Sequence, residues 1–537
     1  MWKKLCCFGT LWLALLALPF ALRHREASPR THLPPAGEAG RGTAEKLVII
    51  SAHNKAVRDE YSRAFRRYCR EKFRREVELD FRSPGGTSDI VRYIADRYEA
   101  EFRRYCEKRG CVWNDVVRRS FSDPAVDRDP KASPEAKRAR KLFLDSDVGI
   151  GIDIFAGGGT FDHARQAARG FGVDGGVRRR HPEYFDPAVI PPKFGGDLLY
   201  DPRGRYYGVV LSTFGIAYNA DRVKEFRDAT PPRRWRDLGD GRFFNTLAVA
   251  DPSKSGSANK CFEIVLQQAM AEAGSPDAGW GPGFSLIKRI FANARDLTDS
   301  ASKVVRDVGT GDAAAGMAID TYGISESKWS ARIFDGTPHC FYVTPRGGTA
   351  VGADPVQLLR GAPHRELAEH FIDFLLSKEG QRLHCFVPGA PGGPEEHSLN
   401  RPPVRRDLYT AEEQKHFFLP GYDPYRSGAD FVYRAEWTGR YYSLLRVLLK
   451  AIALDPHPEL RAAWRAILAA GGPERVPEAM KRFDALPFDY AGAARAAAML
   501  RGAGGESAAE IAATVRSWSD FARRNYHEAE RLAKEGR

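Results

Sequence analysis

The chain has 537 residues, of which 43% are hydrophobic and 28% are charged, and its formal net charge is +13. This length is too great for one hydrophobic core, and the apolar content is too high for wholesale disorder, so we expect two or more folded lobes. Lys and Arg are spread along the chain beside acidic residues, and no base-reading motif accompanies them. We therefore expect no nucleic-acid partner.

The first 22 residues have the pattern of an export segment. Lys3 and Lys4 precede an almost uninterrupted apolar stretch over residues 5–22. Its length lies between that of a signal-peptide core and that of a membrane span, and Arg23 follows it in place of a small-residue cleavage site. We expect export to the periplasm, with residues 1–22 either cleaved as a signal peptide or kept as an inner-membrane anchor. Residues 23–45, rich in Pro, Gly and Arg, are predicted to be a linker.

Six cysteines lie beyond this segment and show neither a CxxC pattern nor a Cys/His metal spacing. Export permits disulfide bonds, and Cys106 with Cys111 is the pair closest in sequence. Burial as small hydrophobic side chains is the simpler interpretation for most of them. The sequence leaves the pairing open.

Alternating strand-like and helix-like patterns begin at residue 46. Short apolar runs predict strands at 46–50, 77–81, 148–155, 207–218, 247–250, 313–319, 341–344 and 348–351. Amphipathic stretches between several of these runs predict helices, which together indicate an α/β fold. The charged stretch at about 100–141 is only loosely periodic and is predicted to be an insertion. Beyond residue 401 the patterns are helical and often rich in Ala.

Three loops repeat one design, in which Gly and a hydroxyl residue stand between an apolar run and a helical pattern. They are SPGGTSDI at 83–90, AGGGTFDH at 156–163 and DPSKSGSA at 251–258. Free backbone N–H groups and the helix dipole attract anions at such a position. Any one of these loops is equally explained as an ordinary capping turn. Three loops of one kind favour a single shared cleft.

Several segments together resemble a known family, the extracellular solute-binding proteins of ABC importers of the ferric-ion and phosphonate type. The resemblance covers residues 46–400 and rests on LVIISAHNKAV, VGIGIDIFAGGG, YGVVLSTFGIAYNADRV, DPSKSGSA, GTGDAAAGMAID and HFIDFLLSKEGQRL. It implies a two-lobed type II periplasmic-binding-protein fold. Lobe one would contain residues 46–210 and 340–400, lobe two residues 211–339, and residues 401–537 would form an α-helical C-terminal extension. The ligand would bind between the lobes and be delivered to an ABC permease in the inner membrane.

The donor-rich loops predict the ligand-binding residues. On the side of the three loops these are Gly86, Thr87, Ser88, Gly159, Thr160, Ser255, Gly256 and Ser257. The second lobe would add Ser212, Thr213, Ser300 and Tyr322. Such a set suits a small anionic solute: a phosphonate, a phosphate ester or a carboxylate.

The resemblance also raises ferric iron as a transported ligand. In iron-binding members a His after the first strand can be a metal ligand, and His53 stands at that place, although a packed or capping His is equally compatible with the pattern. Those members also use two adjacent tyrosines, where this chain has Asp320-Thr321-Tyr322. Asp320 is a candidate ligand in place of the missing tyrosine, although an Asp at a strand end is more often a cap or turn residue. Ferric iron prefers anionic oxygen donors, so a single tyrosine weakens the iron hypothesis. We therefore favour the anion and expect no resident cofactor.

Two other classes of function remain open. The same fold serves an exported ligand-sensing receptor or scaffold that is not coupled to transport, and the helical extension would then contact a partner. An enzyme is not expected, because no Ser-x-x-Lys, Gly-x-Ser-x-Gly, HExxH or paired-carboxylate pattern occurs. We expect a monomer. The identity of the ligand and the role of the extension do not follow from the sequence.

Overall fold

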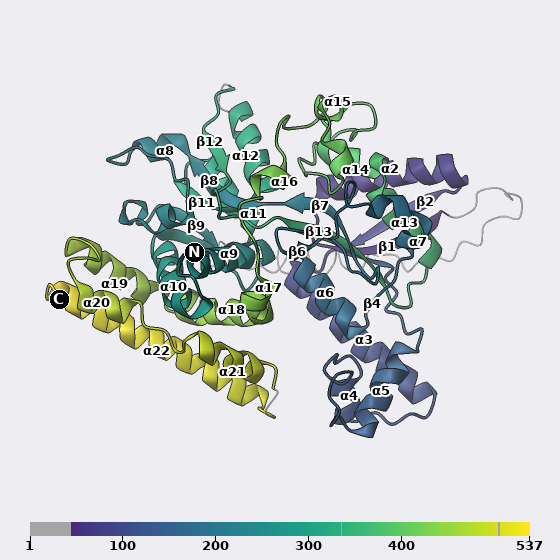
Figure 1. The fold of residues 1–537 in the computed structure, drawn as a ribbon, viewed down its shortest axis with the longest axis horizontal. Helices are drawn as coiled ribbons and strands as arrows, with labels where there is room; N and C mark the ends of the chain where they lie inside the picture. Colours follow the sequence, from purple (N-terminus) through teal and green to yellow (C-terminus); the bar gives the residue numbers. More distant parts are fainter. Residues whose placement is uncertain (1–43, 334–335, 503–504) are drawn as a thin grey trace, which may run out of the picture. The chain divides into compact units, whose positions relative to one another are not determined.

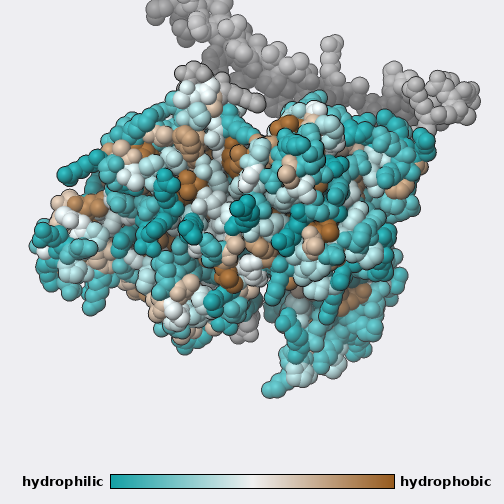
Figure 2. Space-filling model, turned by 45° about the horizontal axis from the view of Figure 1, so that its top comes forward, coloured by the Kyte–Doolittle hydropathy of each residue, from teal (hydrophilic) through white to brown (hydrophobic). Residues whose placement is uncertain are grey.

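The computed structural model describes residues 44–333, 336–502 and 505–537. The predicted export segment and almost all of the predicted linker lie outside these residues. Within the described parts of the chain, no helix is both long and apolar enough to cross a membrane. The face shown in Figure 2 is mainly hydrophilic, with apolar residues scattered over it.

The first sheet combines parallel and antiparallel strands in the order β2-β1-β3-β13-β4, and β7 also pairs with β13. β1, β2 and β3 are mutually parallel, and β13 is antiparallel to β3, β4 and β7. The strands are β1 (Glu45–Ser51), β2 (Val77–Arg82), β3 (Ile154–Ala156), β4 (Gly172–Val173), β7 (Tyr207–Ser212) and β13 (Gly352–Leu359). The strand predicted at 148–155 is thus shorter and begins only at Ile154.

The apolar run of β1 is buried on both faces, which is why it lacks an alternating pattern. Leu47 and Ile49 pack in one core with the helices α2 (Lys55–Phe73) and α13 (Arg365–Leu376). Val48 and Ile50 point to the opposite face and pack in another core with α3 (Thr87–Lys108).

The charged stretch at 100–141 forms helices. The end of α3 packs with α4 (Asp115–Ser120) and α5 (Pro134–Leu144) around the aromatic rings of Phe102, Phe121 and Phe143. These rings belong to the same core as Val48 and Ile50. The weak periodicity therefore reflects short helices around one aromatic cluster.

The second sheet has the order β10-β9-β11-β8-β12. Its strands are β8 (Phe214–Asn219), β9 (Leu247–Ala250), β10 (Ala294–Thr298), β11 (Ala315–Ile319) and β12 (Cys340–Val343). The helices α9 (Gly256–Glu272) and α10 (Pro276–Ala292) share one core with it, and α11 (Ala301–Gly309) lies in another. The run predicted as one strand at 207–218 is divided: β7 belongs to the first sheet, β8 belongs to the second, and the chain passes between them at Thr213.

The strand predicted at 348–351 is wrong. This segment has no strand conformation, because side chains in place of a neighbouring strand satisfy part of its backbone. The Trp235 indole N–H donates to the Gly348 carbonyl oxygen at 2.5 Å. The Thr349 hydroxyl donates to the Ala350 carbonyl oxygen at 3.3 Å. The strand begins after this segment, at Gly352.

The C-terminal region is helical, as its composition predicts. Its longer helices are α18 (Tyr442–Leu449), α19 (His457–Ala469), α20 (Pro477–Phe483), α21 (Tyr490–Leu500) and α22 (Ala508–Lys534). In Figure 1, α19 lies beside α10, and α20 and α22 pack against α19. Trp464, Phe483 and Tyr526 belong to the same buried core as Trp280 and Phe284 of α10. The extension therefore completes the core of the second sheet.

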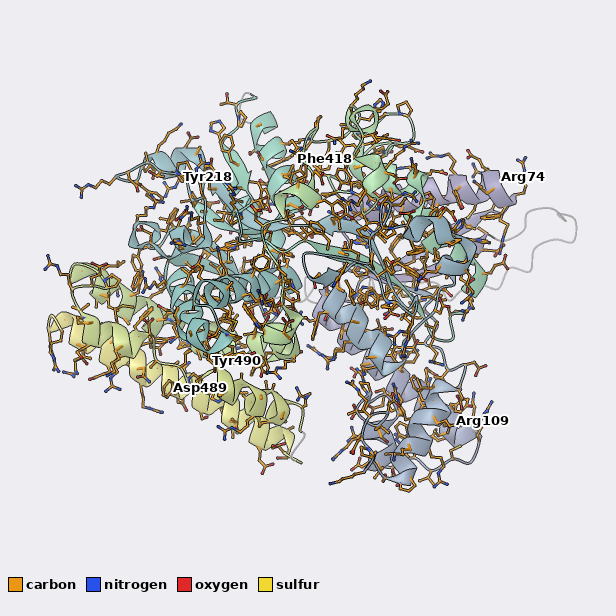
Figure 3. The ribbon with its side chains drawn as sticks, viewed as in Figure 1. Arg74, Arg109, Tyr218, Phe418, Asp489 and Tyr490 are labelled. Carbon is orange, nitrogen blue, oxygen red and sulfur yellow. The ribbon has the colours of Figure 1, made fainter. Side chains whose placement is uncertain are left out.

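Contacts at the start of α21 fix that helix against α17 (Ala435–Thr438) and the helical turn that follows it. Asp489 and Tyr490, both labelled in Figure 3, stand at this point, and the Asp489 carboxylate caps the helix by accepting from the Gly492 N–H at 2.8 Å. The Tyr490 hydroxyl donates to the Trp437 carbonyl oxygen at 2.9 Å, and its ring lies edge-on to Tyr441.

The six described cysteines are all free thiols. Five are buried, and Cys111 is partly exposed. This arrangement fits the interpretation of most of them as small hydrophobic side chains.

The shared core gives a stability test. Trp464 is buried, and its indole N–H donates to the Asn293 side chain at 2.9 Å. We expect Trp464→Ala to lower the free energy of unfolding by about 3–5 kcal/mol in urea denaturation, because it leaves a cavity in the core. The control is Trp329→Ala, whose side chain is 46% exposed and should matter little. Equal small effects would contradict a core shared by extension and sheet.

Candidate ligand-binding cavity

A cavity of about 670 Å³ is lined by residues of the loops that follow strands of both sheets and by residues of the C-terminal extension. Its walls come from the loops after β1, β2 and β3, from the loops after β9, β10 and β11, and from residues 433–442. This volume falls within the range of about 300–1,000 Å³ that is typical of small-molecule sites.

Several helices begin at this cavity. They are α3, α9 and α11, together with α6 (Thr160–Arg169). No side chain caps the first turn of α6 or of α11. At α9, by contrast, the Ser255 hydroxyl accepts from the Ala258 N–H at 3.3 Å. Helix N-termini with free N–H groups make the cavity wall attractive to negative charge.

The three Gly-rich loops adjoin one another. A Cβ atom added to Gly86 would lie 3.3 Å from the Lys254 carbonyl oxygen, which joins the loop after β2 to the loop after β9. Gly158 has a φ of +98°, and a Cβ there would lie 2.6 Å from the Thr87 side chain. Only glycine fits this conformation and this close approach. The design shared by the three loops in sequence therefore corresponds to closeness in space.

Most of the residues predicted for the site line this cavity: His53, Gly86, Thr87, Gly159, Thr160, Ser212, Ser255, Gly256, Ser257, Ser300 and Tyr322. Ser88, Thr213 and Asp320 lie outside its lining. The Asp320 carboxylate accepts from the Thr213 N–H at 3.0 Å and from the Tyr422 hydroxyl at 2.8 Å. These bonds and the full burial of both residues give Asp320 and Thr213 a structural role: they hold the chain at the point where it passes from the first sheet to the second. Burial raises the pKa of Asp320 to about 6.

His53 belongs to an ion-paired cluster that sequence reasoning missed. Its Nε2 lies 3.1 Å from an oxygen of Asp354, and Arg401 pairs with the same carboxylate. Burial, followed by the charge of Arg401, lowers the pKa of His53 well below its usual value. The imidazole is therefore neutral at physiological pH. Asp354 and Arg401 are remote from His53 in sequence, and no local pattern marks them.

A second missed cluster surrounds Lys260 on α9. Its ammonium lies 3.2 Å from Glu263, 3.5 Å from Asp197 and 3.4 Å from the ring centre of Tyr433. All four residues line the cavity. Burial raises the pKa of Asp197, which favours its neutral form, and the Lys260 charge opposes this shift.

Arg446 of the extension joins the starts of several helices. Its guanidinium donates to the Ser88 hydroxyl at 2.9 Å and lies 3.9 Å from the Asp162 carboxylate. A Cβ on Gly256 would lie 3.7 Å from it. Burial raises the pKa of Asp162, and Arg446 acts in the opposite sense. Arg446 thus spans the starts of α3, α6 and α9, and its contact explains why Ser88 lies outside the lining.

The donor set for a metal ion is limited. Within the described residues, no group of three or more His, Cys, Asp or Glu side chains is arranged to hold a metal. Burial raises the pKa of Tyr322, which disfavours the phenolate that ferric iron requires. His53 and Tyr322 both line the cavity, but His53 faces a carboxylate that Arg401 already neutralises.

Comparison with known proteins finds a family match over part of the chain. Residues 183–424 match the sequence profile of a family described as bacterial extracellular solute-binding protein. The family inferred from the sequence is confirmed, and the two-sheet α/β fold with a helical C-terminal region agrees with it. Over these residues the chain is similar to solute-binding proteins of the ABC-transport type. Because this class binds substrates for transport, the expectation that the chain is not an enzyme is confirmed.

Individual relatives are more distant. An uncharacterised protein of Haemophilus influenzae is 27% identical over 230 residues, which span 42% of this chain and 59% of that protein. The phosphoglycerate transport regulatory protein PgtC of Salmonella typhimurium is 27% identical over 181 residues, spanning 34% of this chain and 41% of PgtC. The chain thus matches about half the length of these curated relatives.

Solved structures resemble the chain more broadly and at lower identity. The periplasmic binding protein AfuA from Actinobacillus pleuropneumoniae, with fructose-6-phosphate bound, is 18% identical with a TM-score of 0.45, and the match covers 74% of this chain and 98% of AfuA. Iron-bound HitA from Pseudomonas aeruginosa is 14% identical with a TM-score of 0.47, covering 75% of this chain and 98% of HitA. These likenesses do not bear on the ligand.

A buried histidine behind the cavity gives a pH prediction. His163 on α6 hydrogen-bonds the Gly157 carbonyl oxygen at 2.9 Å, and burial lowers its pKa to about 3. Below about pH 6.5 the unfolded chain binds a proton at this residue, and the folded chain does not. The free energy of unfolding therefore falls by about 1.4 kcal/mol for each pH unit below this value. We expect the stability of His163→Gln relative to wild type to improve by about 2 kcal/mol between pH 6.5 and pH 5.

Urea denaturation of both proteins at several pH values measures this difference. The control is His527→Gln, because His527 is exposed on α22 and is solvated in both states. A pH-independent difference for His163→Gln would contradict a neutral buried imidazole behind the loop.

Proposed function

We propose that this protein captures a small anionic solute, a phosphonate, phosphate ester or carboxylate, and delivers it to an ABC permease in the inner membrane. The observation that carries the proposal is the gathering of the starts of α3, α6, α9 and α11 at one cavity. Backbone N–H groups and helix dipoles at such starts bind anions without a dedicated cation.

The charges of the cavity support this proposal. Acidic side chains do line it, but most are engaged: Asp354 with Arg401, Asp197 and Glu263 with Lys260, and Asp162 with Arg446. Lys254 and Arg440 add positive charge to the lining. The PgtC relative is named for phosphoglycerate transport, which is consistent with an organic phosphate ligand.

The lobe boundaries inferred from the resemblance belong to the same proposal: residues 46–210 and 340–400 form lobe one, and residues 211–339 form lobe two. A ligand that contacts the helix starts on both sides of the cavity would favour the closed arrangement of the lobes. The crossing at Thr213, and the segment between β12 and β13, are the places where such a closure would bend the chain.

Residues 1–22 would export the chain to the periplasm, where it would act as a monomer. We expect a sizeable fraction to stay membrane-bound through residues 5–22, because a basic flank precedes them and no small-residue cleavage site follows. Membrane fractionation, with mass analysis of the mature N-terminus, checks this expectation. Clean cleavage near residue 22 would contradict the anchor and leave export intact.

The serine-rich start of α9 tests the anion. Ser255 and Ser257 line the cavity with their hydroxyl oxygens 3.2 Å apart. A hydrogen bond to a charged group contributes roughly 1.5–3 kcal/mol, so replacing both serines by alanine should weaken anion binding at least about tenfold. Calorimetry with 3-phosphoglycerate, fructose 6-phosphate, 2-aminoethylphosphonate, inorganic phosphate and Fe(III) measures the change.

Two controls belong to this experiment. Ser443→Ala replaces an exposed serine on α18 and should leave binding unchanged. Loss of the Ser255 cap should itself cost about 1 kcal/mol of stability, so thermal unfolding is followed in parallel. If the serine pair is neutral, while Tyr322→Phe or a His53 variant abolishes Fe(III) binding and its phenolate-to-iron colour, the solute is iron and the anion proposal is wrong.

A further inference from the structure

Cys106 and Cys111 share one hydrophobic core. Cys106 is buried in the core that contains the aromatic rings of the insertion, and Cys111 packs against the same core from a partly exposed position. The other cysteines that the structure describes each lie in a different core: Cys69, Cys261, Cys340 and Cys385. The described chain thus brings two thiols into one core at a single place.

The end of α3 turns these two residues toward each other. The Cys111 backbone N–H donates to the Cys106 carbonyl oxygen at 2.9 Å, and the Gly110 N–H donates to the Glu107 carbonyl oxygen at 3.4 Å. Gly110 has a φ of +66°, in the left-handed region. These two bonds and this glycine form a Schellman motif, in which the side chains at the positions of Cys106 and Cys111 commonly contact each other. Here both contacting positions carry a thiol.

The two thiols differ in accessibility, which sets the order in which they can react. Arg109, labelled in Figure 3, and Gly110 form an exposed turn, and Cys111 follows it. Burial, followed by the neighbouring Cys111 thiol, raises the pKa of Cys106 to about 11. A buried, protonated thiol is inert toward outside reagents, so Cys111 is the one that an external oxidant reaches. Cys106 needs to reach only the Cys111 sulfur beside it.

We propose that Cys106 and Cys111 form a disulfide bond once the chain is exported, and that this bond locks the end of α3 to the segment leading to α4. The inference goes beyond the proposed function and rests only on its export step. Disulfide bonds form and persist outside the cytoplasm and are rare within it.

The oxidant is an external disulfide, and the exchange takes two steps. The Cys111 thiolate attacks one sulfur of the external disulfide, which forms a mixed disulfide and releases the first external thiolate. The Cys106 thiol then loses its proton and attacks the Cys111 sulfur, which forms the internal bond and releases the second. The two protons end on the two released thiolates. Two protein thiols are oxidised, and one external disulfide is reduced.

Trypsin gives a direct test, because Lys108 and Arg109 lie between the two cysteines. Cleavage at these residues separates the peptide 105–108 from the peptide 110–118. The full chain, produced in bacteria with residues 1–22, is treated with N-ethylmaleimide before lysis, unfolded and digested without reductant. We expect one species in which the two peptides are joined and which splits into both on reduction. Two separate peptides, each alkylated, would overturn the inference.

Two variants test the pairing and its effect. Cys111→Ala should abolish the joined species, whereas Cys340→Ala, the same change at a cysteine of the second sheet, should keep it. Reduction should lower the Tm of wild type by about 2–4 °C, because the bond restricts the unfolded chain. The Tm of Cys111→Ala should not respond. An equal response of wild type and Cys111→Ala would contradict the lock.

Oxidised glutathione separates the chemistry of the pair from the export of the chain. Purified, reduced, folded wild type is treated with it and mapped in the same way. We expect the joined species to form, and to form faster as the pH rises, because Cys106 must lose its proton. If the pair does not join here, this inference alone is wrong. If it joins here but is alkylated in cells, the chain meets no oxidant, and the inference and the export step are both wrong.

Discussion

The first backbone N–H groups of an α-helix have no acceptor within their own helix, and much of this molecule follows from that constraint. Helices α3, α6, α9 and α11 begin at one cavity, and their first turns are satisfied in different ways. Ser255 caps α9 with its hydroxyl, whereas glycines stand at the start of α3 and α6. Glycine allows the loops to approach one another closely but provides no side-chain acceptor. A cavity built in this way presents donors, and an anion is the natural complement.

The sequence predicted those features that depend on neighbouring residues. Strands buried on both faces appear as continuous apolar runs, and the three Gly-rich loops are recognisable from composition. The polar residues Ser212 and Thr213 interrupt the apolar run at 207–218, but only strand pairing shows that β7 and β8 belong to different sheets. The segment at 348–351 misled for a related reason: Thr349 has high strand propensity, yet the Trp235 and Thr349 side chains bind carbonyl oxygens of this segment in place of a neighbouring strand.

Long-range side-chain contacts account for what the sequence could not show of the site. His53 meets Asp354 across a separation of 301 residues, and Arg446 meets Ser88 across 358. Neither pair has a spacing that pattern reasoning can use. The carboxylates in the cavity also look unfavourable for an anion until their cationic partners are located. The roles of the extension residues Tyr433 and Arg446 could be inferred only from their contacts with residues far away in the chain.

The core shared by the second sheet and the extension has a consequence for synthesis. β8 begins at Phe214, but the core that covers α10 also needs Tyr526 and Ala533, which are synthesised much later. A nascent chain that ends before α22 therefore exposes the large apolar surface of α10 and α19. Contacts of such sequence separation slow folding and leave partly folded states prone to aggregate. The core of the second sheet therefore reaches its native packing only once α22 has been synthesised.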